Sequence, residues 1–319
     1  MQYKLIMGDA SICLKNIANE SIDACITSPP YFGLRDYGMD GQIGNESNPN
    51  EYIQRLVDAF REVKRTLKPC GTLWVIIGDS YAGSGKGGGD PSIGNRNLGG
   101  SKYPIRNIPC GYKTKDLIGI PWLLAFALRK DGWYLRQDII WHKPNAMPES
   151  VKDRCTRAHE YIFMLSKSAR YYYDHETIKE PAVSTNLKKF IDSNKNKQRG
   201  HSRRHTGFNG QYADQLKKNG APKTRNRRSV WTIPTKPYAG AHFAVFPFNL
   251  IEPCVLACSK PEDTILDPFM GSGTTGIVAL LHGRKFIGID INPKYCQMAK
   301  ERLEGTAKPC RPKPTSRRP

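Results

Sequence analysis

Two short segments of the chain combine residue types that could hold and modify a small polar group. The first is Ser28-Pro29-Pro30-Tyr31, which directly follows the apolar run 22–26. The Ser28 hydroxyl and the Pro29 carbonyl both offer lone pairs to an N–H donor. The prolines fix the turn and leave few competing donors, while the Tyr31 ring offers a flat face for stacking. This segment therefore suits a planar group that carries an amine.

The second segment is a glycine-rich turn between a predicted strand and a predicted helix. It has the sequence Asp267-Pro268-Phe269-Met270-Gly271-Ser272-Gly273-Thr274-Thr275 and follows the apolar residues 264–266. Its two glycines allow positive φ and a close approach of the backbone to a ligand. We expect its two final threonines to cap the following helix. The next predicted strand, 285–289, ends in Asp290, an acid at the position where nucleotide-binding folds hold ribose hydroxyls.

Together these motifs resemble the permuted β group of DNA amino-methyltransferases, which use S-adenosylmethionine (SAM). Ser28-Pro29-Pro30-Tyr31 resembles the catalytic motif, and the run 267–275 resembles the SAM loop. The catalytic motif comes first in the chain, as it does in that group. The resemblance covers nearly the whole chain apart from a basic insert and the tail. It implies a permuted Rossmann-like fold, SAM as the cofactor, duplex DNA as the substrate and no metal.

The resemblance also assigns residues to the cofactor. The main set, carried by the loop and the following strand, is Asp267, Pro268, Phe269, Gly271, Ser272, Gly273, Thr274 and Asp290. It further implies that Phe246 and Pro247 line the methionine side of SAM and that Asp9 lies near the adenine. The residue types alone also allow simpler, structural interpretations of these positions. Phe246 is also typical of core packing, and Asp9 of a turn after a strand.

The target of the reaction is expected to be an exocyclic amine on a flipped base. Such an amine is a poor nucleophile because its lone pair is delocalised, so acceptors at Ser28 and Pro29 would favour a reactive geometry. Serine at position 28 is the family's usual pattern for N4-cytosine, which we favour over N6-adenine. A catalytically inactive DNA-binding specificity module is the alternative from another class. An enzyme acting on RNA or a protein amide usually has the opposite motif order.

The charge of the chain agrees with a nucleic-acid partner. The 319 residues contain 49 Lys and Arg against 29 Asp and Glu, a formal net charge of +20. Such an excess of positive charge indicates a polyanionic partner, and nucleic acid is favoured over an anionic membrane. The resemblance places target recognition in the basic insert, where we expect DNA contacts from Lys188, Lys189, Arg199, Arg203, Arg204, Arg225, Arg227 and Arg228. A solvated basic loop is the plainer reading of the same residues.

Alternating strands and helices predict an α/β fold whose mostly parallel sheet has helices on both faces. The predicted strands are 3–7, 22–27, 72–77, 135–141, 161–165, 264–266 and 285–289. The predicted helices are 51–67, 120–130, 248–258, 275–281 and 293–303. The strands at 135–141 and 161–165 are expected to pair antiparallel, because no clear helix separates them. The first helix is expected to stop at Lys68-Pro69-Cys70-Gly71.

The predicted catalytic domain has two parts, 1–181 and 230–306, around the basic insert 182–229. A Gly-rich loop at 81–103 and a basic, disordered tail at 307–319 complete this division. No apolar run is long enough to span a membrane, and the first residues resemble a strand rather than a signal peptide. We therefore expect a cytoplasmic protein, bacterial or phage-encoded. A cognate restriction endonuclease is a candidate partner, and both monomer and homodimer fit.

The nine cysteines have no zinc-site spacing and are expected to stay reduced. Cys254 and Cys258 stand four residues apart in a predicted helix. We expect them to pack as small hydrophobic side chains.

Overall fold

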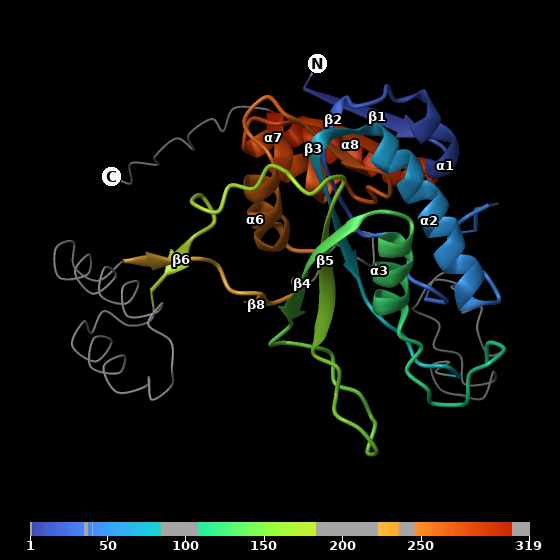
Figure 1. Cartoon of the computed structure of the whole chain (residues 1–319). Coiled ribbons are helices and arrows are strands. Elements are labelled where there is room, and N and C mark those ends of the chain that lie inside the picture. Colours follow the sequence, from blue (N-terminus) through green and yellow to red (C-terminus); the bar gives the residue numbers. More distant parts are fainter. Residues whose placement is uncertain are drawn as a thin grey trace, which may run out of the picture. The chain divides into compact units, whose positions relative to one another are not determined.

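A computed structural model describes residues 2–34, 38–39, 41–83, 108–182, 223–235 and 246–307. The chain divides into two compact units. One comprises Met1–Asp174 with Ser229–Pro319, and the other comprises His175–Arg228. In its described residues, the smaller unit has an antiparallel pair of short strands, β6 (Glu180–Pro181) and β7 (Thr224–Arg225). The larger unit holds the central sheet (Figure 1).

Eight strands of the described residues form that sheet. In spatial order they are β1 (Tyr3–Met7), β10 (Lys285–Asp290), β9 (Thr264–Asp267), β2 (Ile22–Thr27), β3 (Leu67–Ile77), β5 (His159–Ser166), β4 (Tyr134–His142) and β8 (Val230–Thr232). Neighbouring strands pair parallel except at β5, which is antiparallel to both β3 and β4. The predicted α/β fold with a mostly parallel sheet is confirmed, including the antiparallel β4–β5 pair.

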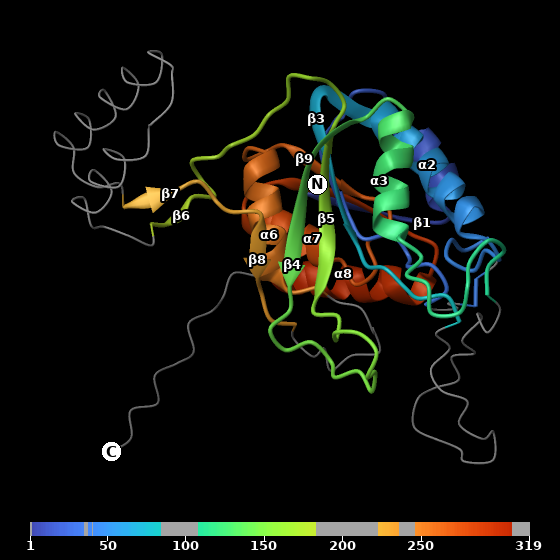
Figure 2. The same cartoon turned by 60° about the horizontal axis from the view of Figure 1, so that its bottom comes forward.

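Helices cover both faces of the sheet, as predicted. Figure 2 shows α2 (Pro49–Thr66) and α3 (Ile120–Lys130) on one side of it, and α6 (Phe248–Cys258) and α7 (Thr274–Leu281) on the other. The remaining described helices are α8 (Pro293–Ala307), the short α1 (Ala10–Cys13) and the 3₁₀ turn η1 (Leu14–Asn16). A helix is stable here because one face is apolar and packs on the sheet. On α2 that face includes the buried Leu56, Phe60 and Val63.

The start of β3 differs most from the prediction. Residues 68–71 do not form a turn after α2, because β3 begins directly at Leu67. Leu67 pairs with Ile22, and the register shifts before Ala24 pairs with Thr72. This irregularity takes up the additional residues of β3. The Lys-Pro-Cys-Gly sequence therefore lies within a strand, although its composition is typical of a helix stop.

Two further predictions from the sequence concern the cysteines of α6 and membrane-spanning segments. Cys254 and Cys258 are buried in α6, at 0% and 3% exposure, which confirms that they pack as small apolar groups. Among the residues that the structure describes, no helix has the length and apolar character needed to cross a membrane.

Candidate active site

The carboxyl ends of four neighbouring parallel strands bring the predicted motifs together. Met7 of β1 pairs with Asp290 of β10, and Gly288 of β10 pairs with Asp267 of β9. Strand β2 lies beside β9 and ends immediately before Ser28. Because parallel strands end at one edge of the sheet, residues far apart in sequence become neighbours there. The catalytic motif and the glycine-rich loop thus share one edge.

A buried hydrogen bond connects the two motifs directly. The Thr27 hydroxyl, at the end of β2, donates to Oδ1 of Asp267 at 2.7 Å. The same oxygen accepts the backbone N–H of Phe269 at 3.1 Å. Burial raises the pKa of Asp267 to about 6, although the bond from Thr27 opposes this shift. The carboxylate therefore fixes the start of the glycine-rich loop against the strand that precedes the catalytic motif.

The turn of the catalytic motif is held from helix α2. The hydroxyl of Tyr52, which is fully buried, donates to the carbonyl oxygen of Pro30 at 2.8 Å. The Tyr52 ring also lies 5.4 Å from that of Phe32, between centroids. This support sets the path of the backbone on either side of Tyr31. The sequence-based prediction did not include Tyr52 in the site.

Tyr31 points its hydroxyl toward a carboxylate on β5. Its Oη donates to Oε2 of Glu160 at 2.9 Å. Burial raises the pKa of Tyr31 well above its ordinary value and nearby Glu160 raises it further, whereas a hydrogen bond from Ser28 lowers it. Tyr31 therefore stays protonated at neutral pH and acts as a hydrogen-bond donor. Ser28 itself is half-buried at the edge of the sheet.

Glu160 has a second partner on the neighbouring strand. The Lys143 ammonium, just after β4, contacts Oε1 of Glu160. The same ammonium lies 4.2 Å above the centroid of the Trp141 ring, an arrangement that favours a cation. Glu160 is placed here because β5 runs antiparallel, so its first residues lie beside the carboxyl end of β3. Both carboxylate oxygens of Glu160 thus have a donor.

The glycine-rich loop has the conformation expected for close ligand approach. Gly271 and Gly273 have φ values of 50° and 75°. Asp290 supports the loop, since its Oδ2 accepts the N–H of Gly271 at 2.9 Å and its Oδ1 accepts that of Asn292 at 2.8 Å. Burial raises the pKa of Asp290 to about 6. A carboxylate has about four acceptor positions, so this one can also accept ribose hydroxyls.

The threonines after the loop do not cap α7, contrary to prediction. The N-cap is Gly273 in the left-handed conformation, and the helix begins at Thr274. Both threonines therefore belong to the first turn and are buried. Arg302 of α8 contacts the carbonyl oxygen of Ser272 and lies 3.3 Å from the Thr274 hydroxyl. Arg302 thus supports the loop from α8.

Asp9 and Pro247 have local structural roles at this edge. Oδ1 of Asp9 accepts the N–H groups of Ser11 at 2.8 Å and Ile12 at 3.2 Å, which caps α1. This is the turn role that the sequence left open beside adenine binding. Pro247 is buried and is the N-cap residue of α6, and Phe246 before it is half-buried.

The predicted DNA-binding residues belong to the smaller unit. Arg225 of β7 donates from Nε to Oε1 of Glu180 at 2.8 Å, so it has a partner within that unit. Arg227 and Arg228 follow in the described residues. The remaining candidates lie outside the described residues; they are Lys188, Lys189, Arg199, Arg203 and Arg204. Most of the Gly-rich loop 81–103 also lies outside the described residues.

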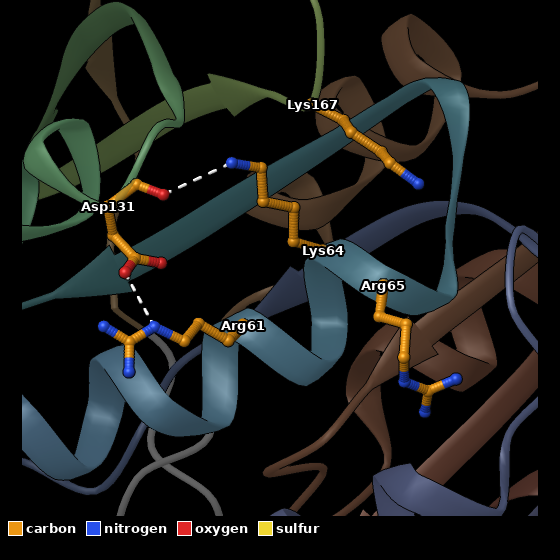
Figure 3. Close-up of a pocket in the computed structure, with 5 residues that line it drawn as sticks. All are labelled: Arg61, Lys64, Arg65, Asp131 and Lys167. Carbon is orange, nitrogen blue, oxygen red and sulfur yellow. Dashed lines mark hydrogen bonds and ion pairs between the residues drawn. The ribbon is translucent and has the colours of Figure 1, made fainter.

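A hollow lined mainly by cations lies at the opposite end of the strands, near the start of β3 (Figure 3). Arg61 pairs with Asp131 at 2.7 Å, and Lys64 donates to the carbonyl oxygen of Gly132 at the same distance. Arg65 pairs with Glu62 at 2.9 Å, and Lys167 donates to the carbonyl oxygen of Leu67 at 2.6 Å. Each of these four cations therefore has a protein partner, and their contacts connect α2 with the end of α3 and the start of β3.

The comparisons with known proteins agree with this architecture. A family model described as DNA methylase matches residues 22–301. The chain is 49% identical over 300 residues to Type II methyltransferase M.SmaI of Serratia marcescens, covering 94% of this chain and 90% of that protein. It is 48% identical over 301 residues to Type II methyltransferase M.Cfr9I of Citrobacter freundii, covering 94% and 87%.

Two solved structures share the fold. One is a putative DNA modification methylase from Thermus thermophilus complexed with S-adenosyl-L-methionine, with a TM-score of 0.57, 25% identity and coverage of 95% and 94%. The other is the cytosine-N4-specific PvuII DNA methyltransferase, with a TM-score of 0.61, 19% identity and coverage of 96% and 91%. Because the family model matches residues 22–301 and M.SmaI is 49% identical over 94% of this chain, the chain belongs to the DNA methylase family.

Proposed function

We propose that this protein transfers a methyl group from SAM to the exocyclic N4 of cytosine in duplex DNA. The observation that carries the proposal is the juxtaposition of Ser28-Pro29-Pro30-Tyr31 with the glycine-rich loop, joined by the bond from Thr27 to Asp267. The order of these motifs along the chain corresponds to the permuted β group. The Type II methyltransferases among its relatives support a DNA substrate.

The residues at the carboxyl ends of the strands have the chemistry needed to bind SAM. The loop at Gly271 and Gly273 has the positive φ values that bring backbone close to a ligand. Asp290 is the acid for the ribose hydroxyls, Asp9 lies near the adenine, and Phe246 with Pro247 lines the methionine side. The other cofactor residues are Asp267, Pro268, Phe269, Ser272 and Thr274. When bound, SAM supplies an electrophilic methyl group on a positively charged sulfur.

The catalytic motif prepares the amine to react. The cytosine is flipped out of the duplex and stacks on Tyr31, as base-modifying enzymes require. The Ser28 hydroxyl and the Pro29 carbonyl accept its two N–H groups and favour a pyramidal nitrogen. The nitrogen lone pair then forms a bond to the methyl carbon, while the electrons of the carbon–sulfur bond pass to sulfur. One proton leaves the nitrogen for water, giving N4-methylcytosine and S-adenosylhomocysteine.

The choice of cytosine over adenine depends on position 28. Serine is the usual residue there in N4-cytosine enzymes, whereas aspartate is usual in N6-adenine enzymes. The basic smaller unit is proposed to recognise the target sequence. Its arginines suit both phosphate contacts and guanine edges.

The test is to incubate purified protein with unmethylated duplex DNA and SAM, digest the DNA to nucleosides and identify the product by mass spectrometry. N4-methylcytosine supports the proposal. N6-methyladenine keeps the mechanism and overturns the base assignment. A folded protein that binds SAM but yields no methylated nucleoside from varied DNA favours a DNA-binding specificity module or an enzyme that acts on RNA or a protein amide.

A further inference from the structure

We propose that Lys143 is a positioning residue, which holds the ring of Tyr31 in place for the flipped base through the carboxylate of Glu160. The inference rests on the proposed function, because it concerns the ring on which the target cytosine would stack. A ring whose plane is fixed before the base arrives does not lose that freedom on binding, so preorganisation favours the reactive complex. The contacts that fix Tyr31 therefore bear on the rate of methyl transfer.

The outer end of the Tyr31 side chain is joined to β5 by a hydrogen bond. Its hydroxyl donates to Oε2 of Glu160 at 2.9 Å. The edge of the ring is packed against Gly78, where an added Cβ would lie 2.8 Å from Cε2 of Tyr31 and 3.4 Å from Cδ of Glu160. Because the ring is bounded at Gly78 and its hydroxyl bonds to Glu160, the place of the carboxylate sets the place of the ring.

The carboxylate of Glu160 is placed in turn by Lys143. The Lys143 ammonium contacts Oε1 of Glu160, and the two side chains are each 18% exposed. A largely buried carboxylate that loses its cation keeps an uncompensated charge, so it moves toward water or takes up a proton. Either change moves or alters the acceptor to which the Tyr31 hydroxyl donates. Lys143 therefore acts on Tyr31 without touching it.

The Lys143 ammonium is itself held by the ring of Trp141. It lies 4.2 Å from the centroid of that ring, and a cation over an indole face is attracted to it. Trp141 is 4% exposed, and its indole N–H donates to the carbonyl oxygen of Ile233 at 2.8 Å. Trp141 also pairs directly with Glu160 between β4 and β5, so both side chains lie on one face of the sheet. The support of Tyr31 thus begins at a ring fixed in the sheet.

The test is a double-mutant cycle with Lys143→Met, Tyr31→Phe and the double variant. Met keeps the apolar length of the lysine without its charge, and Phe keeps the ring without its hydroxyl. Single-turnover methyl transfer is measured over a range of duplex DNA concentrations, beside SAM affinity, melting temperature and the salt dependence of DNA binding. Lys68→Met is the matched control, because Lys68 pairs with Asp23 at 2.7 Å near the amino ends of β2 and β3.

We expect Lys143→Met to slow transfer at saturating DNA about tenfold, because a small displacement of a positioned group has an effect of this size. The DNA concentration for half-maximal rate and the SAM affinity should stay within about twofold of wild type, since phosphate contacts dominate DNA affinity. In the Tyr31→Phe background the same change should alter the rate by less than about twofold, because the ring is no longer joined to Glu160. Lys68→Met should transfer at the wild-type rate.

A wild-type rate for Lys143→Met, or effects of the two changes that multiply, overturns the inference. A slope of log K against log salt that falls by about one in Lys143→Met also overturns it, because Lys143 would then be a phosphate contact. If Lys143→Met does not fold, the cycle is run with Lys143→Gln, which also removes the charge, and is judged by the same coupling. Failure of the proposed function is distinguishable, since wild type itself would then yield no N4-methylcytosine.

Discussion

The Thr27 hydroxyl donates to the buried Oδ1 of Asp267 at 2.7 Å, across 240 positions of sequence. Thr27 is the last residue of β2 and directly precedes the catalytic motif, whereas Asp267 is the last residue of β9 and the first of the glycine-rich loop. The bond therefore joins the two halves of the site through strands that lie side by side. A change at either residue should affect both folding and cofactor affinity.

Replacing Thr27 with valine should lower the free energy of unfolding by about 1–3 kcal/mol, because a buried carboxylate loses its hydroxyl donor. The loss should be larger at pH 8 than at pH 5. Asp267 has a folded pKa of about 6, above its unfolded value, so its contribution to stability is present at low pH and lost as pH rises through 6. Removing a bond that opposes this shift raises the pKa further. Urea denaturation at both pH values measures the difference.

Thr66→Val is the control for this variant, since Thr66 is equally buried but donates only to the carbonyl oxygen of Val63 in its own helix. It should leave SAM affinity unchanged, whereas Thr27→Val should weaken it. Equal SAM affinity in Thr27→Val and wild type would show that the bond does not organise the loop.

Replacing Ser28 with alanine should reduce methyl transfer about a hundredfold or more while SAM affinity stays near wild type. The variant removes the hydroxyl that we propose accepts from the reacting amine, and losses of this size are typical of such groups. Ser21→Ala provides the comparison, because the Ser21 hydroxyl donates to the carbonyl oxygen of Ala18 just before the other end of β2. Single-turnover rates that are equal in the two variants would remove Ser28 from the catalytic motif.

The affinity for SAM should fall as the pH is lowered from 7 to 5. In the proposed function, ribose hydroxyls donate to the ionised form of Asp290, whose pKa is raised to about 6 by burial. If only that form binds, the apparent Kd should rise about tenfold at pH 5. Isothermal titration calorimetry measures this dependence. Asp290→Asn should bind more weakly at pH 7 and lose most of the pH dependence, and a flat profile in wild type would separate Asp290 from the ribose.

Local patterns were sufficient to predict most of the elements. The bounds of β1, α3 and α6 agree with the sequence-based prediction, because apolar spacing and flanking Pro and Gly define them locally. The prediction was wrong at residues 68–71, where pairing of Leu67 with Ile22 overrode a composition typical of a helix stop. It was also wrong about the capping threonines, because the left-handed Gly273 already ends the turn.

The support of the catalytic motif could not be predicted in the same way. Glu160 lies 129 positions from Tyr31, and their contact depends on the register of an antiparallel strand in the middle of the sheet. The one signal in the sequence is an acid at the start of a strand that is otherwise strongly apolar. Tyr52 carries no such signal, because an aromatic residue on the buried face of a helix is ordinary core packing.

Replacing Gly78 with alanine should slow methyl transfer about tenfold to a hundredfold by moving Tyr31. The added Cβ would lie 2.8 Å from a ring atom of Tyr31, a separation that forces one of them to shift. SAM affinity should stay within twofold of wild type, because the cofactor loop is on other strands. Gly305→Ala is the control, since a Cβ there meets nothing within 4 Å. A wild-type single-turnover rate for Gly78→Ala would mean that the ring tolerates the displacement.

Replacing Arg203 and Arg204 with alanine should weaken DNA binding without changing SAM affinity. If both neutralise phosphates, the slope of log K against log salt should fall by about one for each residue. The loss should be nearly the same for every duplex sequence, because phosphate contacts carry no sequence information. Lys285→Ala removes one positive charge at the start of β10, at the edge of the sheet opposite the site, and should change the slope little. Loss of affinity for one sequence only would instead assign these arginines to base edges.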